Sequence, residues 1–241
     1  SNSFRQYQQH RIRQHMLPLP LISIQDCIIF FFFCMVISSL WLQLLPGEHL
    51  AIVGPSGSGK TSLLLALQNK LHYHGKITMH ANTEPLVFVG QIHQFKNKSN
   101  TADFYYQQRY HAIDAADSMT AQEWIGTDTH SIRHAMPGID DLLEKPLVQL
   151  SNGEHKKIQL AKALTAQPKM LLLDQPIIGL DTASRKWLHQ KLQGLAASGI
   201  TIVLATASTE MPACITHVLQ LHHDGSHQFT TKANWHATLK D

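Results

Sequence analysis

A short glycine-rich stretch most constrains how this chain can fold. Residues 54–61 read Gly-Pro-Ser-Gly-Ser-Gly-Lys-Thr and fill every fixed position of the pattern G-x-x-x-x-G-K-[ST]. The apolar run Leu50–Val53 precedes them as a predicted buried strand, and Ser62–Leu67 follows as the predicted first turns of a helix. A strand, a glycine-rich loop and a helix in this order predict an α/β fold with a parallel sheet.

The same stretch predicts a phosphate-binding loop. Its glycines let successive backbone N–H groups point at phosphate oxygens, and the helix start adds a partial positive charge. Lys60 can then reach the β- and γ-phosphates, while the Thr61 hydroxyl is placed to ligate Mg²⁺. A glycine-rich turn that binds nothing is the alternative, but the complete motif in its strand-loop-helix setting argues against it. The residues expected to bind the nucleotide here are Gly54, Pro55, Ser56, Gly57, Ser58, Gly59, Lys60, Thr61 and Ser62.

Composition bounds the class of protein. The 241 residues suit one large α/β domain or a domain with a subdomain, and 44% hydrophobic residues are ample for a core. A net charge of +3 from 20 basic and 17 acidic residues is too balanced to indicate a nucleic-acid partner. The 17 histidines are scattered along the chain, and the three cysteines form no C-x-x-C, which favours a reducing compartment.

An apolar stretch near the N-terminus allows two interpretations. Residues 1–20 are expected to form a flexible extension. The segment Cys27–Leu45 carries no charged residue and is long enough for a membrane helix. With three upstream arginines it could also be mistaken for a signal sequence. Ser38, Ser39 and Gln43 interrupt it, however, and a Pro-Gly turn at 46–47 follows. We therefore predict two strands, Leu21–Phe31 and Val36–Leu45, with a membrane anchor as the minority alternative.

The remaining chain alternates between apolar runs and helical patterns. Strands are predicted after a turn at Gly75–Thr78 and at Pro85–Val89, Met170–Asp174, Ile200–Ala205 and Val218–Leu221. Helices are predicted from about His155 to Ala166 and at Ser184–Ala197. Between Phe95 and Glu144 the helical spacing at Phe104–Ile113, Thr120–Ile125 and Ile139–Leu143 predicts a mainly helical insertion.

The phosphate loop and the carboxylate that ends the strand Met170–Asp174 belong together. Neighbouring parallel strands deliver a loop and a carboxylate to the same edge of a sheet, so the two form the halves of a Mg·nucleotide site. Asp174 is therefore a predicted metal ligand beside Thr61.

At this point the chain resembles the ATP-binding-cassette (ABC) ATPases, and the resemblance covers nearly all of it beyond Leu21. Residues 54–61 match the Walker A motif, Gln91 matches the Q-loop, and Met170–Asp174 matches Walker B. Residues 150–154, Leu-Ser-Asn-Gly-Glu, are similar to the family signature LSGGQ, and residues 179–181, Gly-Leu-Asp, to the D-loop. Phe31 lies about where the family has its adenine-stacking aromatic. The signature is the specific part, because a phosphate loop alone would leave kinases and GTPases open.

The resemblance implies a fold and a division of the chain. It implies a P-loop NTPase with a RecA-like parallel-sheet core, an antiparallel β subdomain and a helical signature subdomain. Residues 21–241 would form a single ABC ATPase domain, in which 21–90 and 146–241 make the nucleotide-binding core with the β subdomain, and 91–145 the mainly helical subdomain. The signature variant and Pro212–His217 resemble, less firmly, the cassettes encoded with molybdate-uptake systems.

The resemblance also implies a mechanism and partners. Two cassettes, as a homodimer or heterodimer, would close head to tail with each Mg·ATP between Walker A of one chain and the signature of the other. Ser151, Gly153 and Glu154 would face the partner's nucleotide, and Thr61, Gln91 and Asp174 would hold Mg²⁺. A separate membrane permease would be the further partner, which places the chain at the cytoplasmic face of the membrane.

Four departures from the family pattern bear on activity. Asn152 replaces a glycine and Glu154 a glutamine in the signature, which is expected to weaken the clamp without abolishing it. Gln175 stands where the family has the glutamate that polarises the attacking water, and Ala207 where it has a histidine on the γ-phosphate. Gln175 can hold a water but cannot take its proton, so we expect slow hydrolysis. A deliberate substitution at 175 is the alternative, which leaves Ala207 unexplained.

Three functions remain open from the sequence. The leading one is the ATP-binding subunit of an ABC-type system, an ATPase that drives transport. The second is a non-transport switch that uses cassette closure to regulate or assemble a partner. The third is a membrane-anchored nucleotide-binding protein, which would use Cys27–Leu45 as its span.

Overall fold

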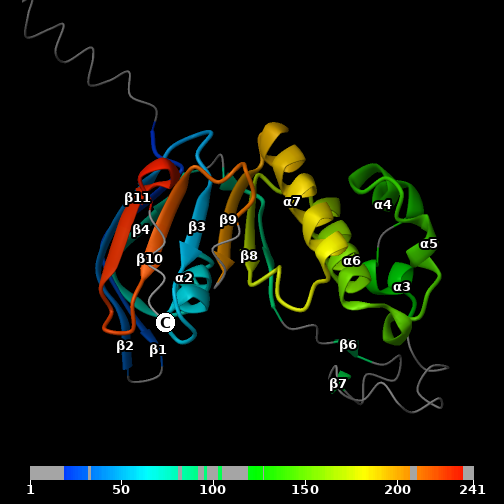
Figure 1. Cartoon of the computed structure of the whole chain (residues 1–241), viewed down its shortest axis with the longest axis horizontal. Helices are drawn as coiled ribbons and strands as arrows, with labels where there is room; N and C mark the ends of the chain where they lie inside the picture. Colours follow the sequence, from blue (N-terminus) through cyan, green and yellow to red (C-terminus); the bar gives the residue numbers. More distant parts are fainter. Residues whose placement is uncertain are drawn as a thin grey trace, which may run out of the picture.

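The computed structural model shows where the predicted elements lie in space. It describes residues 19–31, 34–80, 83–91, 95–96, 103–104, 119–126, 128–206 and 211–235, and of Phe31, Cys34, residues 95–96 and residues 103–104 the backbone alone. Figure 1 shows two sheets at one end of the molecule and a group of helices at the other.

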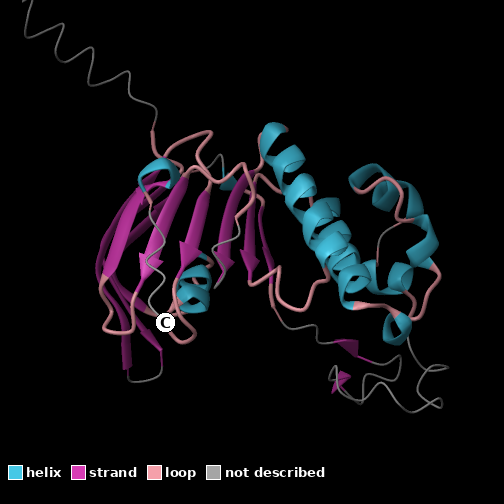
Figure 2. Cartoon of the chain, viewed as in Figure 1, coloured by secondary structure: helices cyan, strands magenta, loops and turns pink. Residues whose placement is uncertain are grey.

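A six-stranded sheet forms the centre of the fold (Figure 2). Its strand order is β11-β10-β3-β9-β8-β5, in which β11 is antiparallel to β10 and the other neighbours are parallel. The strands are β3 (Leu50–Val53), β5 (Leu86–Val89), β8 (Met170–Asp174), β9 (Thr201–Thr206), β10 (His217–Leu221) and β11 (His227–Thr231). The parallel core predicted from the apolar runs is therefore confirmed, with boundaries shifted by one residue at β5, β9 and β10.

The two faces of this sheet are buried against different layers. Along β3, Leu50 and Ile52 belong to one hydrophobic cluster, and Ala51 and Val53 to another, because successive side chains of a strand point to opposite faces. The first cluster includes helix α2 (Lys60–Leu67) and the second sheet of the molecule. The other cluster includes the helices of the opposite face. Burial on both faces explains why these strands are continuous apolar runs.

A three-stranded antiparallel sheet covers α2 on the side away from the central sheet. Its order is β2-β1-β4, with β1 (Ile22–Phe31), β2 (Cys34–Leu44) and β4 (Tyr73–Met79). The apolar stretch Cys27–Leu45 is therefore mainly strand, as predicted. In the part of the chain that the structure describes, no helix is long and apolar enough to cross a bilayer.

One detail of β4 differs from the prediction. Gly75 lies inside the strand, whereas the sequence predicted a turn there. It has φ +100°, and a Cβ on it would lie 2.2 Å from the carbonyl oxygen of Asp26, where β1 bulges. Asp26 itself has a positive φ, so the two irregular residues face each other across the sheet. The glycine marks a bulge because only a residue without a side chain allows this approach.

The helices of the opposite face begin after residue 118. They are α3 (Ala121–Ile125), α4 (Thr129–Ala135), α5 (Asp140–Leu143), α6 (Asn152–Thr165) and α7 (Thr182–Ala197), with 3₁₀ turns at Leu147–Gln149 and Lys232–Asn234. The sequence did not predict α4. Phe104 lies in a short strand, β7 (Asp103–Phe104), paired with β6 (Phe95–Lys96), so the predicted helix does not begin there. Residues 105–113 lie outside the described residues, and the proposed division at 91–145 stays a prediction.

Candidate nucleotide-binding site

The glycine-rich loop connects the end of β3 to the start of α2. Gly54 passes so close to the end of β10 that a Cβ would lie 2.4 Å from the carbonyl oxygen of Leu221. Pro55, Ser56 and Gly57 are exposed, whereas Ser58 and the following residues turn into the buried start of α2. The loop is therefore exposed where it leaves the sheet and buried where it enters α2. We call this loop, which is open to solvent on one side, the phosphate cradle.

The start of α2 lacks the usual protein partners. Gly59, its N-cap, has φ +94° and no side chain to accept from the first turn, and no acidic residue lies in that turn. The first N–H groups of a helix have no intrahelical acceptor, so an anion from outside would satisfy them. The sequence thus leaves this helix start suited to a phosphate group.

Lys60 is folded back onto the loop. Its Nζ donates hydrogen bonds to the carbonyl oxygens of Gly54 at 2.8 Å and Pro55 at 2.6 Å, and the residue is 4% exposed. Burial lowers the pKa of Lys60, and the nearby charge of Asp174 opposes that shift. The ammonium therefore lies inside the cradle, where it is positioned to meet phosphate oxygens.

Thr61 and Asp174 meet across the sheet edge. Thr61 Oγ1 donates to Asp174 Oδ2 at 2.8 Å, while Asp174 Oδ1 is buried without a hydrogen-bond partner. Burial raises the pKa of Asp174, against the Thr61 hydrogen bond and the charges of Lys60 and Lys156. A hydroxyl and an unsatisfied carboxylate oxygen at one point are the oxygen donors that Mg²⁺ prefers, so the residues fit the predicted metal.

Gln175 follows Asp174 in a left-handed conformation. Its φ is +49°, its N–H donates to the carbonyl oxygen of Ala205 at 2.9 Å, and its side-chain Oε1 is buried without a partner. Gln91 is exposed and lies two residues beyond β5, at the same edge of the sheet as Asp174. Phe31 ends β1, but its side chain and the whole of Ala207 lie outside the described residues.

The signature residues form the start of α6 and a complete capping box. Ser151 Oγ accepts from the N–H of Glu154 at 3.3 Å, and Glu154 Oε2 accepts from the N–H of Ser151 at 2.8 Å. The predicted helix start at about His155 was therefore three residues late, because Ser-x-x-Glu is itself a helix-start pattern.

The carboxylate of Glu154 has a partner of opposite charge. Lys145 Nζ donates to Glu154 Oε1 at 2.9 Å. This contact and the Ser151 N–H lower the pKa of Glu154 to about 2. Sequence reasoning treated Glu154 as an acidic group near a phosphate. In the structure the Glu154 carboxylate contacts Lys145 and the Ser151 N–H. The N–H groups of Asn152 and Gly153, in the first turn of the helix, have no intrahelical acceptor.

The signature and α2 lie on opposite faces of the central sheet. α6 packs in one hydrophobic cluster and α2 in the other. Figure 1 shows α6 on the far side of β8 from α2. The structure therefore brings Lys60, Thr61 and Asp174 together but does not bring Ser151 and Gly153 to the phosphate cradle of their own chain.

Sequence reasoning missed one cation near this site. Lys156 of α6 is 3% exposed, and its Nζ donates to Gln159 Oε1 at 2.9 Å and, at 3.4 Å, to the carbonyl oxygen of Gly90. Burial lowers the pKa of Lys156 to about 8, against the attraction of Asp174. The periodicity of α6 could have indicated it, because Lys156 lies four residues before the buried Leu160 on the same helix face.

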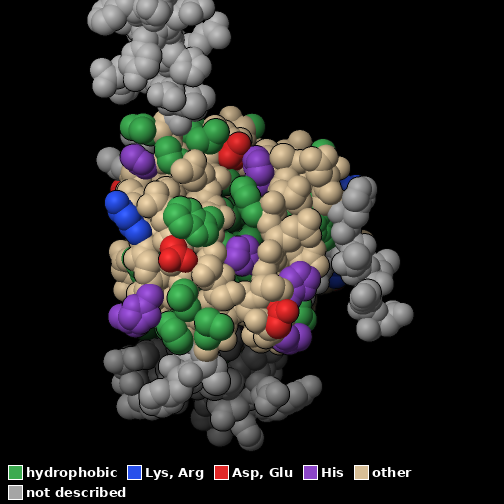
Figure 3. All heavy atoms as spheres, turned by 90° about the vertical axis from the view of Figure 1, so that its left-hand side faces the viewer, with side chains coloured by type: hydrophobic (Ala, Val, Ile, Leu, Met, Phe, Trp, Pro, Cys, Tyr) green, Lys and Arg blue, Asp and Glu red, His purple; other side chains and the backbone are tan. Residues whose placement is uncertain are grey.

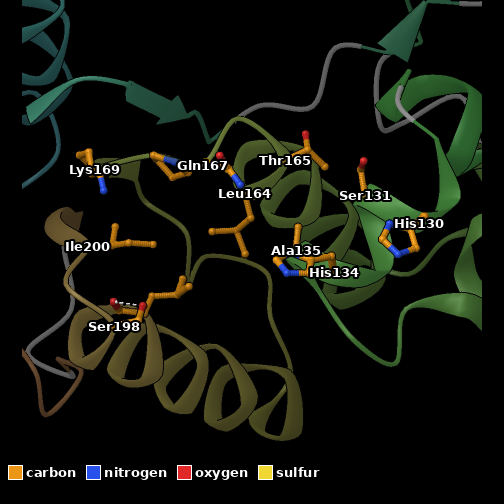
Figure 4. Close-up of a pocket in the computed structure, with 12 residues that line it drawn as sticks. His130, Ser131, His134, Ala135, Leu164, Thr165, Gln167, Lys169, Ser198 and Ile200 are labelled. Carbon is orange, nitrogen blue, oxygen red and sulfur yellow. Dashed lines mark hydrogen bonds between the residues drawn. The ribbon is translucent and has the colours of Figure 1, made fainter.

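Other surfaces of the described chain offer weaker sites. A cavity of about 670 Å³ lies between α4, the end of α6 and the end of α7 (Figure 4), and none of the predicted site residues lines it. On the face seen in Figure 3 the histidines are spread among hydrophobic and acidic side chains. Within the described residues, no group of three or more His, Cys, Asp or Glu could hold a metal ion.

The parallel sheet, the cradle and the paired Thr61 and Asp174 together define a P-loop NTPase. Comparison with known proteins narrows the class: a model of the family described as ABC transporter matches residues 37–178, more than half of the chain. The chain belongs to the ABC transporter family, as one of its ATP-binding ATPase domains. The predicted family and fold class are thereby confirmed, whereas the molybdate type stays a prediction.

Similar proteins agree with this assignment. The cobalt import ATP-binding protein CbiO of Rhodobacter capsulatus is 29% identical over 205 residues, which cover 78% of this chain and 70% of that protein. The zinc import ATP-binding protein ZnuC of Roseobacter denitrificans is 33% identical over 165 residues, 66% of this chain and 57% of that protein. A nucleotide-free ATP-binding cassette from an ABC transporter superposes with a TM-score of 0.70 at 16% identity, over 88% of this chain and 92% of that one.

Other relatives are longer than this chain. An uncharacterized ABC transporter ATP-binding protein of Schizosaccharomyces pombe is 28% identical over 193 residues, which cover 72% of this chain and 39% of that protein. A putative ABC transporter ATP-binding protein of Streptomyces coelicolor is 34% identical over 190 residues. These residues cover 76% of this chain and 33% of that protein.

Proposed function

We propose that this chain is the ATP-binding subunit of an ABC-type system. It binds Mg·ATP at an interface with a second cassette and couples ATP binding and hydrolysis to transport through a separate membrane permease, at the cytoplasmic face of the membrane. The observation that carries the proposal is that Lys60, Thr61 and Asp174 lie together at one edge of the sheet, at the start of α2, which has no side-chain cap.

Each group in the cradle has a role in this function. The loop N–H groups and Lys60 hold the phosphates, with Lys60 exchanging its bonds to Gly54 and Pro55 for phosphate oxygens. Thr61 and Asp174, with Gln91 from the neighbouring strand end, supply oxygens to Mg²⁺. The metal neutralises phosphate charge when bound. The side chains of Phe31 on the adenine and of Gln175 on the attacking water complete the proposed set.

The second cassette completes the site. Ser151 and Gly153 lie at the start of α6 on the opposite face of the sheet from α2, so their donors suit a phosphate presented by another chain. The pairing of Glu154 with Lys145 supports this role, because it reduces the repulsion that a free carboxylate would exert on that phosphate.

Hydrolysis by this chain is proposed to be slow. Gln175 holds its Oε1 in a buried position beside Asp174 and has no group that takes a proton at neutral pH. Losing a general base costs about 10²- to 10⁴-fold in rate. The cargo would be chosen by the permease, since the relatives named above are called import proteins for different metals.

ATP-dependent dimerisation tests this proposal. Ser151→Arg places bulk where the partner's phosphate would lie, so sizing chromatography with light scattering in Mg·ATP should show a dimer for the unmodified chain and a monomer that still binds ATP for the variant. Ser198→Arg, at an exposed position at the end of α7, is the matched control and should dimerise. An equal dimer for all three proteins would place the interface elsewhere. A chain that stays monomeric in Mg·ATP would leave only a heterodimer with a different cassette.

A further inference from the structure

The signature touches the loop after Walker B within the same chain. Asn152 Nδ2 donates a hydrogen bond of 3.0 Å to the carbonyl oxygen of Gly179, across 27 residues. A Cβ on Gly179 would lie 3.1 Å from that same nitrogen. The side chain of Asn152, which departs from the family pattern, therefore has a defined partner.

The two helix starts around this bond are also in direct contact. A Cβ on Gly153 would lie 2.1 Å from Ser184 Oγ and 2.9 Å from Ser184 Cβ, so the first turns of α6 and α7 meet without space between them. Asp181 caps α7 by accepting from the Ser184 N–H at 2.7 Å. The start of α7 is thus fixed, and the loop that leads to it is fixed at its far end.

The loop 175–181 is held at few points between Asp174 and α7. The Gln175 N–H donates to the carbonyl oxygen of Ala205, and the Ile178 and Leu180 N–H groups close turns onto Gln175 and Ile177 at 3.3 and 3.2 Å. Arg185 Nη2 donates to the carbonyl oxygen of Leu180 at 3.4 Å. Ile177 and Leu180 are buried, whereas Ile178 is 55% exposed, which is unusual for a side chain of this kind. The bond from Asn152 falls directly after Ile178.

We propose that Asn152 is a positioning residue that locks loop 175–181 to the start of α6. The locked unit presents Ser151, Gly153 and Ile178 as one preformed surface, the signature–loop surface, to a second cassette. The identity of this partner rests on the proposed function, whereas the lock itself is a property of the single chain.

The physical effect of the lock is preorganisation. A loop that is ordered before association does not lose that freedom when the partner binds, so the affinity rises without any new contact across the interface. Removing one neutral hydrogen bond changes an equilibrium about twofold to tenfold. We therefore expect Asn152→Ala to weaken Mg·ATP-dependent dimerisation by that factor and to leave the ATP affinity of the monomer unchanged.

Amide hydrogen exchange in the nucleotide-free chain tests the lock. Asn152→Ala and Asn152→Asp should both speed exchange of the Ile178 and Leu180 amides about twofold to tenfold, since neither side chain can donate to Gly179. The aspartate separates the lock from simple weakening of α6, because a negative charge in the first turn stabilises a helix start. Exchange at 178–180 equal to that of the unmodified chain in both variants would overturn the inference.

Dimerisation provides the second arm. Light scattering across a protein dilution series in saturating Mg·ATP should place the dimer midpoint of Asn152→Ala at a higher protein concentration than that of the unmodified chain, with equal ATP binding by calorimetry. Equal midpoints despite faster exchange would overturn the preformed surface. If the unmodified chain does not dimerise while exchange rises in both variants, the lock stands, and the homodimer form of the proposed function fails, which leaves a heterodimer with a different cassette.

Discussion

Thr61 Oγ1 lies 2.8 Å from Asp174 Oδ2, although 113 residues separate the two in the sequence. The strand order β3-β9-β8 causes this approach, because β9 alone lies between the strand that leads to the cradle and the strand that ends in Asp174. Asp174 is buried and its Oδ1 has no hydrogen-bond partner, whereas Thr61 is exposed. The two residues therefore form a half-complete oxygen site before any nucleotide is bound.

Removing the ammonium of Lys60 should weaken ATP binding. Charge-assisted hydrogen bonds contribute about 1.5–3 kcal/mol each, so Lys60→Ala should raise the Kd for Mg·ATP by about tenfold to a hundredfold in titration calorimetry. Lys70→Ala, at an exposed position beyond α2, is the control and should bind like the unmodified chain. Unchanged affinity in Lys60→Ala would count heavily against the site.

Restoring a proton acceptor at 175 should speed hydrolysis. Gln175→Glu is expected to raise single-turnover hydrolysis by about one decade or more if this group limits the chemical step. Adding Ala207→His should raise it further and non-additively, because both side chains would act on one water and one γ-phosphate.

Gln193→Glu introduces the same charge on the exposed side of α7 and should have no effect. Brisk hydrolysis by the unmodified homodimer, with no gain from either substitution, would contradict the slow-site interpretation and require another base.

A methyl group at Gly153 should destabilise the chain through Ser184. In an open helix position Gly→Ala stabilises by about 1 kcal/mol, but overpacking costs about 1–3 kcal/mol, and the Cβ would overlap both side-chain atoms of Ser184. Urea unfolding should therefore show Gly153→Ala as destabilised. In the Ser184→Gly background, which removes the overlapping side chain, Gly153→Ala should cost much less stability than it costs in the unmodified chain. If the effects of Gly153→Ala and Ser184→Gly on stability were additive, the two helix starts would lie farther apart than in the structure.

His49 should make the stability depend on pH. Its Nδ1 accepts from the N–H of Ile202 at 3.1 Å, and burial lowers the pKa of His49 below its ordinary value of 6.5. Below that pH the unfolded chain takes up a proton that the folded chain does not, so the free energy of unfolding should fall as the pH falls.

His49→Asn is the matched comparison, because an amide oxygen can replace the acceptor without titrating in this range. Denaturant unfolding between pH 7 and 5 should show a smaller slope for the variant, by at most about 1.4 kcal/mol per pH unit. Equal slopes would show that His49 binds its proton in the folded chain as well.

The sequence predicted the elements whose signal is local. The core strands are apolar runs because both faces of the sheet are covered, and Leu50–Val53 and Met170–Asp174 have the predicted bounds. The metal-directed carboxylate followed from a strand that ends in Asp174, since parallel strands end at one edge. The two strands are not direct neighbours as predicted, because β9 lies between β3 and β8. The strand pair Ile22–Phe31 and Cys34–Leu44 followed from the polar residues that interrupt the apolar run and from the Pro-Gly turn at 46–47 that follows it.

Features that depend on distant neighbours could not be predicted in the same way. The bulge at Gly75 depends on Asp26, and the partner of Asn152 lies 27 residues away. The start of α6 has a local signal, because Ser151 and Glu154 are spaced as a capping box, and it could have been predicted from the sequence. The ion pair of Glu154 with Lys145 could be seen only in the folded chain, since eight residues, including the 3₁₀ turn Leu147–Gln149, lie between them.

That ion pair also determines how far the charge of the signature reaches. A lone carboxylate at the start of α6 would act as a monopole on an approaching phosphate, whereas Glu154 and Lys145, 2.9 Å apart, act as a dipole whose field decays faster with distance. Ionic strength screens long-range fields most strongly, so the rate at which two cassettes meet should depend less on salt than the acidic signature alone suggests. Lys145→Ala would expose the monopole and restore that dependence.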